Sequence, residues 1–226
     1  MQSFPLDPRL EGRRLYLMRH GKTYEPVLDS LVASPEEDPE LPLTADGVAA
    51  VETTARALSS LAFDAAWSSP YRRSHHTASI VAEHHALEVT RVAGLEELRV
   101  HLPGAATMLD IARRYIQIAR ELRECDPHEV ELEPGVSIGA IAERATHALI
   151  ECLTASSAKT VLVVAHGGIN RLLLTQMLGM HLSRFLSIDQ DFACVNVVEF
   201  LRRGRPSLRA VNLTVNDPFK SGDVGV

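Results

Sequence analysis

Two histidines in this chain each stand at the end of a strand-like segment and directly before a glycine. His20 follows the run 15–18 and Arg19, and His166 follows the run 160–165. Short continuous apolar runs are typical of buried parallel strands, and open α/β sheets bind ligands where such strands end. For one stretch taken alone, a histidine that merely finishes a strand near the surface is an equal alternative. Two such units in one chain favour a shared site.

Basic residues accompany both histidines. Arg19 precedes His20, and Arg72 and Arg73 follow a Ser-Pro pair in a pattern that predicts the start of a helix. Helix N-termini attract anions, and neighbouring residues on a helix point in different directions, so only one of these two arginines can face a site. Two guanidiniums, glycine amides and a helix N-terminus suit a doubly charged tetrahedral anion, which indicates phosphate.

The same residues suggest how a phosphoryl group would react. A neutral imidazole is a good nucleophile toward phosphorus, and nearby arginines favour the neutral form. A carboxylic acid can protonate the departing alkoxide, and Glu96 and Glu97 follow a third strand-like segment. The paired histidines at 75–76 and 84–85 diverge on a helix, and the three cysteines form no CxxC pair. The sequence therefore predicts neither a metal site nor a cofactor.

The elements that must position these residues alternate between strands and helices, which predicts an α/β fold. Thr44 is expected to cap a helix over 45–61, with Asp46 in its first turn. Residues 101–136 fall between sheet-forming units and are expected to form a small helical cap over the active face. The predicted strands are 15–18, 65–68, 88–92, 160–165, 193–200 and 208–213, and one or both of the last two are expected at a sheet edge. Further helices are predicted at 105–123, from Ser137 and at 169–178. An acidic loop is predicted at 124–134.

Five segments, in order along the chain, resemble the motifs of the histidine phosphatase superfamily, the phosphoglycerate mutase-like group. Residues 17–23 (Leu-Met-Arg-His-Gly-Lys-Thr) are similar to its RHG signature, and residues 43–47 to its PLTxxG segment. Residues 69–78 resemble SPLxRAxQTA, residues 95–98 resemble LxE, and residues 164–168 resemble the second histidine motif. Each segment alone is a weak signal, but the five together are specific.

This resemblance implies a three-layer α/β/α sandwich with a mostly parallel central sheet. It implies that His20 attacks phosphorus and becomes phosphohistidine while Glu97 protonates the departing oxygen, after which Glu97 helps water to release phosphate. Alignment with the family motif selects Arg73 rather than Arg72, and Glu97 rather than the adjacent Glu96. The residues that the resemblance assigns to holding the phosphoryl oxygens are Arg19, Thr23, Arg73, His166 and Gly167.

Departures from the family pattern separate the alternatives. Pro26 stands where the family often has asparagine, so one phosphate contact is expected to be missing or replaced. The segments that mark cofactor-dependent phosphoglycerate mutases are not found, which favours hydrolysis and leaves mutase-type phosphoryl transfer as the alternative. A non-catalytic phospho-ligand-binding module of the same fold is disfavoured because both histidines and both arginines are present. A dinucleotide-binding oxidoreductase is disfavoured because no GxGxxG follows the first strand.

Composition bounds the partners. A chain of 226 residues is long enough for one domain over 1–226, with or without the inserted cap. Its net charge of −6 argues against non-specific nucleic-acid binding. No apolar run approaches membrane-spanning length and no signal-peptide pattern is seen, so a cytoplasmic location is expected. The expected ligands are a small phosphorylated substrate and inorganic phosphate as product. Substrate specificity is expected to depend on residues 24–43 and 101–136, where no pattern identifies the substrate. The sequence also leaves open whether the protein forms a homodimer.

Overall fold

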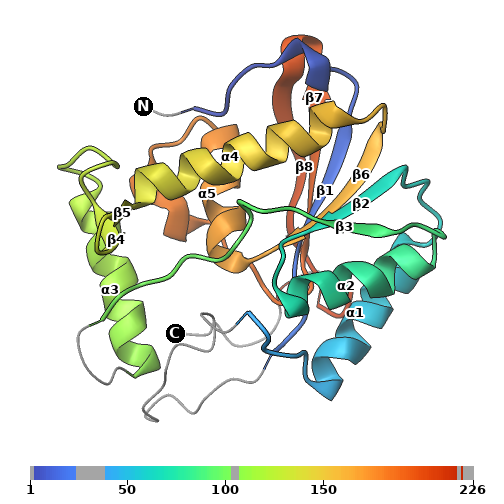
Figure 1. The fold of residues 1–226 in the computed structure, drawn as a ribbon, viewed down its shortest axis with the longest axis horizontal. Coiled ribbons are helices and arrows are strands. Elements are labelled where there is room, and N and C mark those ends of the chain that lie inside the picture. The colour runs from blue at the N-terminus through green and yellow to red at the C-terminus, as the bar shows by residue number, and fades with distance from the viewer. Residues whose placement is uncertain (1–2, 24–38, 103–106, 218–219, 221–226) are drawn as a thin grey trace.

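A six-stranded sheet with helices on both faces forms the centre of the computed structural model, which describes residues 3–23, 39–102, 107–217 and 220 (Figure 1). The strands are ordered β3-β2-β6-β1-β7-β8, and the first four run parallel while β7 and β8 are antiparallel. This arrangement confirms the predicted mostly parallel three-layer α/β/α sandwich. The strands are β1 (Arg14–Arg19), β2 (Ala65–Ser68), β3 (Val89–Arg91), β6 (Thr160–Ala165), β7 (Val195–Leu201) and β8 (Arg205–Leu213).

The two central strands are buried on both faces, which explains their continuous apolar sequences. Side chains alternate along a strand, so Leu15 and Leu17 of β1 join one core cluster while Tyr16 and Met18 join another. Strand β6 divides its side chains between the same two clusters. Helices α1 (Ala45–Leu58) and α2 (Arg72–Glu83) cover one face, and α4 (Ile138–Ala155) and α5 (Gly167–Met177) cover the other (Figure 1).

Helix boundaries follow local capping chemistry. The Thr44 hydroxyl accepts a hydrogen bond from the Gly47 N–H at 3.0 Å, as expected for the N-cap of α1. Ser137 caps α4 in the same way through the Ala140 N–H. Thr107 and Asp110 form a reciprocal capping box at the start of α3 (Met108–Glu121). The predicted helices at these three places are therefore confirmed, with shorter bounds than the predicted 45–61 and 105–123 for α1 and α3.

Three segments differ from the sequence prediction. The expected acidic loop 124–134 contains β4 (Glu131–Glu133), which pairs with β5 (Val136–Ser137) and buries Leu132 between two glutamates. Helix α5 begins two residues earlier than predicted, at Gly167. The residues before β1, where the sequence predicts no element, contain the 3-10 helix η1 (Pro8–Leu10), and Phe4 is buried with its N–H donating to the Gln176 carbonyl at 3.1 Å.

The segment expected to form a cap, residues 101–136, contributes side chains to the main hydrophobic core. Ile118 and Leu122 of α3, together with Leu132 of β4, belong to the core cluster that contains Leu17. The ring of Tyr115 lies 6.3 Å from the ring of Phe185 in the 3-10 helix η3 (Leu182–Ser187). This segment is thus attached to the α4 and α5 side of the sheet.

Candidate active site

His20 and His166 meet because β1 and β6 are adjacent parallel strands whose carboxyl ends are in register. Arg19 pairs with Ala165, and the His20 N–H donates to the Ala165 carbonyl at 3.1 Å. The two imidazole centroids are 5.1 Å apart with the ring planes at 66°. Both side chains are buried. The two strand ends therefore place the two rings in one location.

Hydrogen bonds fix the neutral tautomer of His20. Its Nδ1 lies 2.8 Å from the Gly21 carbonyl oxygen, which can only accept, so Nδ1 carries the ring proton. Its Nε2 accepts a hydrogen bond from Nε of Arg73 at 3.3 Å. The Nε2 lone pair of His20 therefore points toward a guanidinium, where an anion would also be attracted.

The two arginines at the start of α2 have different surroundings. Arg73 is 1% exposed and its guanidinium lies over the Tyr71 ring, 4.8 Å from the centroid, whereas Arg72 is exposed. The Arg19 guanidinium lies 3.9 Å from the centroid of Phe192. Its Nη1 donates to the Gln190 carbonyl at 2.5 Å, while its buried Nε has no hydrogen-bond partner among the described residues.

A serine sets the orientation of His166. The Ser69 hydroxyl oxygen accepts from the Tyr71 N–H at 3.4 Å and lies 2.8 Å from Nε2 of His166, so its own proton is available to this nitrogen. The Ser74 hydroxyl oxygen lies 3.4 Å from the same nitrogen. In the tautomer in which Nε2 accepts from Ser69, the ring proton is on Nδ1. This nitrogen is buried and has no partner within the part of the chain that the structure describes. It is thus a donor available to a ligand.

Burial lowers the pKa of His20 well below its ordinary value of 6.5, and the charges of Arg19 and Arg73 lower it further. Burial is also the first cause of the lowered pKa of His166, followed by His20 and the same two arginines. The hydrogen bond to the Gly21 carbonyl opposes the shift at His20 without reversing it. Both imidazoles are therefore neutral near pH 7, as a nucleophilic nitrogen requires.

Glu97 and Glu96 are separated by the fold. The buried Glu97 carboxylate accepts from the backbone N–H groups of Gly168 and Ile169 at 3.2 and 3.3 Å, at the N-terminus of α5. Glu96 accepts from the Gly94 N–H instead and lies 4.0 Å from Arg144. Glu97 is thus within one helical turn of His166, whereas Glu96 is directed toward α4.

Close backbone contacts explain two motif glycines. A Cβ on Gly47 would lie 2.1 Å from the Lys22 carbonyl oxygen, and a Cβ on Gly21 would lie 2.9 Å from the Gly47 carbonyl oxygen. The start of α1 therefore packs directly on the loop that follows His20. The Thr77 hydroxyl holds the same loop by accepting from the Gly21 N–H at 3.0 Å.

Thr23 and Gly167 are the other two predicted phosphate ligands. Thr23 is buried and forms an isolated antiparallel bridge with Leu43. Gly167 is the first residue of α5, and a Cβ there would lie 3.2 Å from Nε of Arg19. Pro26, which replaces an asparagine of the family pattern, lies outside the described residues.

Sequence reasoning did not single out Tyr71, Phe192 or Gln190. Tyr71 stands inside a recognised motif, and its ring centroid is 5.1 Å from that of His166. Phe192 and Gln190 precede β7 and carry no local signal, because they reach Arg19 only through the antiparallel pairing of β7 with β1.

Two surface hollows lie away from these residues. One of about 360 Å³ is lined at the opposite end of the sheet by residues that include Arg13 and Arg14. The other, of about 780 Å³, lies along α4 and includes Glu96 and His147. Among the described residues, no three histidine, cysteine, aspartate or glutamate side chains are grouped so as to hold a metal ion. Over that same part of the chain, no helix has the length and apolarity needed to cross a membrane.

Comparison with protein families gives a match to the model of the histidine phosphatase superfamily (branch 1) over residues 15–214. A phosphoserine phosphatase 1 of Hydrogenobacter thermophilus is 28% identical over 204 residues, which cover 89% of this chain and 92% of that protein. A 2-carboxy-D-arabinitol-1-phosphatase of Triticum aestivum is 25% identical over 222 residues and 96% of this chain. The chain spans only 44% of the length of the wheat protein.

A solved structure supports the fold independently. The phosphoserine phosphatase of Entamoeba histolytica, solved in complex with 3-phosphoglyceric acid, superposes with a TM-score of 0.71 at 21% identity. The superposition covers 90% of this chain and 98% of that one. At this level of identity the likeness concerns the fold.

Proposed function

Because this chain belongs to the histidine phosphatase superfamily (branch 1), we propose that it hydrolyses a small phosphomonoester through a phosphohistidine on His20. The observation that carries the proposal is the state of the His20 ring. Its unprotonated Nε2 faces the Arg73 guanidinium, and the second neutral imidazole, His166, is 5.1 Å away between centroids. The named phosphatases among its relatives support the same activity.

In the first step, His20 Nε2 forms a bond to phosphorus and the ester oxygen departs with the electron pair of the broken P–O bond. The Arg73 N–H that bonds Nε2 is taken by a phosphoryl oxygen, and Nε of Arg19 donates to another. Nδ1 of His166 supplies a third donor, and the proposal gives the Thr23 hydroxyl and the Gly167 amide the same role. Preorganised donors of this kind stabilise charge on the transferring group. In this proposal Glu97 enters the step as the carboxylic acid and gives its proton to the departing alkoxide, which leaves a carboxylate.

In the second step, a water molecule attacks phosphorus and the N–P bond breaks, which restores neutral His20 and releases inorganic phosphate. Glu97 removes a proton from the attacking water and so returns to its starting state. No metal ion or organic cofactor is needed to balance either step. We propose that a single domain over 1–226, with the segment 101–136 as its cap, performs this reaction in the cytoplasm, without nucleic-acid or membrane partners.

The substrate is proposed to be a small phosphorylated metabolite. Two of the curated relatives are named for phosphoserine and for 2-carboxy-D-arabinitol 1-phosphate, and two solved structures of the same fold carry the name alpha-ribazole phosphatase. These names support a small phosphomonoester for this chain.

Turnover of an aryl phosphate in the presence of EDTA tests the proposal directly. Wild-type protein should release phosphate, and His20→Ala should lose this activity because the nucleophile is gone. Arg72→Gln is the matched control, since Arg72 neighbours Arg73 in sequence but is exposed. Full activity of the His20→Ala variant would contradict the assignment of the nucleophile, and activity lost in EDTA would contradict metal independence.

Trapping the intermediate tests the chemistry itself. Protein quenched in alkali during turnover of a labelled substrate should carry the label on His20, because phosphohistidine survives alkali and is lost in acid. Transfer of the label to a second alcohol in place of water would favour mutase-type phosphoryl transfer.

A further inference from the structure

Three buried amide side chains meet at the segment that binds the Arg19 guanidinium. Gln190 accepts a hydrogen bond from Nη1 of Arg19 with its main-chain carbonyl at 2.5 Å, and it stands just before the turn that leads into β7. Its side chain is 3% exposed, and Asn196 of β7 and Asn170 of α5 are fully buried. These three residues, Asn170, Gln190 and Asn196, are called the amide cluster below. The proposed reaction assigns no role to them.

Hydrogen bonds with the backbone fix the orientation of these amides. Nδ2 of Asn196 donates to the Leu17 carbonyl at 2.9 Å, and Oδ1 of Asn196 accepts from the Asn212 N–H at 2.9 Å. Because a carbonyl only accepts and an N–H only donates, the Asn196 amide has one possible orientation. The Gln190 amide is then fixed too, since its Nε2 donates to Oδ1 of Asn196 at 2.9 Å and its Oε1 accepts from Nδ2 at 2.8 Å. Asn170 donates to the same Oε1 at 3.2 Å.

Contacts on several sides hold the Arg19 guanidinium. The Phe192 ring centroid lies 3.9 Å from it, and a Cβ on Gly167 would lie 3.2 Å from Nε of Arg19. Nη1 is bound by the Gln190 carbonyl, while the buried Nε has no partner among the described residues. The direction in which this free donor points therefore depends on where the Gln190 carbonyl lies.

The turn after Gln190 needs support from its surroundings. Ala193 has a φ of 58°, in the left-handed region that is unfavourable for a residue with a Cβ. Its N–H donates to the His20 carbonyl at 3.1 Å, and the Asp191 N–H donates to Oδ1 of Asn212 at 2.7 Å. Such a conformation persists only where neighbouring contacts hold it. At the start of the turn, the contacts of the Gln190 side chain are those of the amide cluster.

We propose that the Gln190 side chain, fixed by Asn196 and Asn170, is a positioning residue for Arg19. It holds its own main-chain carbonyl where Nη1 of Arg19 binds, and so directs Nε of Arg19 toward a phosphoryl oxygen. The proposal rests on the proposed function and adds the residues that orient one of its donors. An amide cluster that only stabilised β7 would leave phosphate binding by the folded protein unchanged.

Replacing the Gln190 amide by an apolar side chain of similar length tests this role. Gln190→Met should lower kcat for an aryl phosphate on the order of ten- to a hundredfold, because a misplacement of about 1 Å can cost this much. Its affinity for inorganic phosphate, measured by calorimetric titration, should fall as well. Gln176→Met is the matched control, since Gln176 is also 3% exposed but bonds Thr146 at the other end of α5. This control should match wild-type protein per folded molecule.

A double-variant cycle separates positioning from a general structural role. In the Arg19→Ala background the donor is absent, so adding Gln190→Met should weaken phosphate binding by less than about twofold. Asn170→Ala provides a milder change, because Oδ1 of Asn170 has no partner among the described residues and only the bond to Gln190 is lost. Alanine also favours the helix. Its smaller loss of phosphate affinity should likewise vanish in the Arg19→Ala background.

The NMR resonance of the Arg19 Nε–H gives a readout that does not depend on turnover. With inorganic phosphate bound to wild-type protein, this proton should be protected from exchange with water, and its loss in Arg19→Lys assigns it. Gln190→Met should remove the protection, whereas Gln176→Met should retain it.

Wild-type phosphate affinity in both Gln190→Met and Asn170→Ala would overturn the proposal. So would an equal loss of affinity with and without the Arg19 side chain, or an equal loss in Gln176→Met. These results are distinct from a failure of the proposed function, which is tested by His20→Ala and an aryl phosphate.

Discussion

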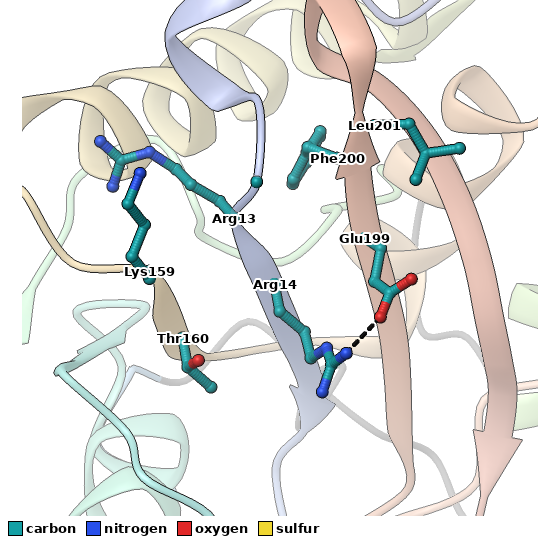
Figure 2. A pocket seen from close by; sticks show the side chains of 8 residues that line it. Arg13, Arg14, Lys159, Thr160, Glu199, Phe200 and Leu201 are labelled. Atoms are coloured by element: carbon teal, nitrogen blue, oxygen red, sulfur yellow. Dashed lines mark hydrogen bonds and ion pairs between the residues drawn. The ribbon is translucent and has the colours of Figure 1, made fainter.

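Arginines gather at both ends of the central sheet, but their surroundings differ. At the amino ends of β1 and β6, Arg13 donates to the carbonyl oxygens of Arg9 at 3.1 Å, Ser156 at 2.7 Å and Ala158. Its neighbour Arg14 forms an ion pair with Glu199 across the hollow of about 360 Å³ (Figure 2). At the carboxyl ends, Arg19 and Arg73 surround two neutral imidazoles.

The difference lies in whether polar atoms are satisfied. Nε of Arg19 and Nδ1 of His166 are buried and lack hydrogen-bond partners among the described residues, whereas Arg13 has three acceptors. An unsatisfied buried polar group costs about 1–3 kcal/mol, so such atoms are expected where a ligand completes them. The two arginines at the amino end have acceptors among the described residues. Two unsatisfied donors beside His20 distinguish the proposed active site from the amino end, while a further unpaired buried nitrogen, Nε2 of His85, lies against the Phe63 ring instead.

The largest effect on turnover is expected when a proposed phosphoryl donor, His166 or Arg73, is removed. His166→Ala and Arg73→Ala are each expected to lower aryl phosphate turnover by on the order of 10²–10³-fold or more, because a preorganised donor to the transferring group is lost. Arg13→Gln, at the other end of the sheet, should leave turnover unchanged. Steady-state kinetics on folded variants measures this contrast. A loss of less than tenfold at the carboxyl end would mean that these residues do not contact the phosphoryl group.

Sequence patterns were sufficient for the elements whose signal is local. The strand at 160–165 was predicted to the residue because a continuous β-branched run has few alternatives. The acidic segment 124–134 is predicted as a loop because its charges outweigh two apolar positions, Val130 and Leu132, both of which the structure buries. Polar and apolar residues alternate there only from Glu129 to Glu133.

Long-range contacts were not predictable from those patterns. Helix α5 begins at Gly167 although glycine is a poor helix former, because the Glu97 carboxylate, about 70 residues earlier, binds the first free amides. The contact of Arg19 with Gln190 likewise depends on strand pairing. The motifs located His20, Arg73 and His166 in the sequence, while the fold supplied Tyr71 and Phe192 as their surroundings.

Acid should destabilise the folded protein through the two imidazoles at the carboxyl ends of β1 and β6. The folded protein holds the pKa of His20 and His166 well below 6.5, so below about pH 6.5 the unfolded chain binds protons that the folded chain does not. The free energy of unfolding should therefore fall as pH falls from about 7.5 toward 5. Burial lowers the pKa of His75 and His85 as well, which adds to the same trend.

Histidine variants separate the contribution of the proposed active site to this pH dependence from that of the other histidines. The difference in urea midpoint between pH 7.5 and pH 5.5 should be smaller for His166→Gln than for wild-type protein. His76→Gln removes an exposed histidine and should match the wild type. Equal pH dependence in His166→Gln and wild type would show that His166 titrates alike in the folded and unfolded chains.

The smallest expected effect concerns stability at the amino end. Arg13 donates to carbonyls of Ser156 and Ala158, just past the last residue of α4, where unpaired carbonyl oxygens and the helix dipole both favour a cation. Arg13→Met should lower the free energy of unfolding by about 1–3 kcal/mol, because buried acceptors lose their donor. Aryl phosphate turnover per folded molecule should not change, as urea unfolding and kinetics on the same sample would measure. Loss of turnover without loss of stability would show that the two ends of the sheet are functionally coupled. We expect no such coupling, because the donors of Arg13 are satisfied within the protein, whereas the unsatisfied donors lie at the proposed active site.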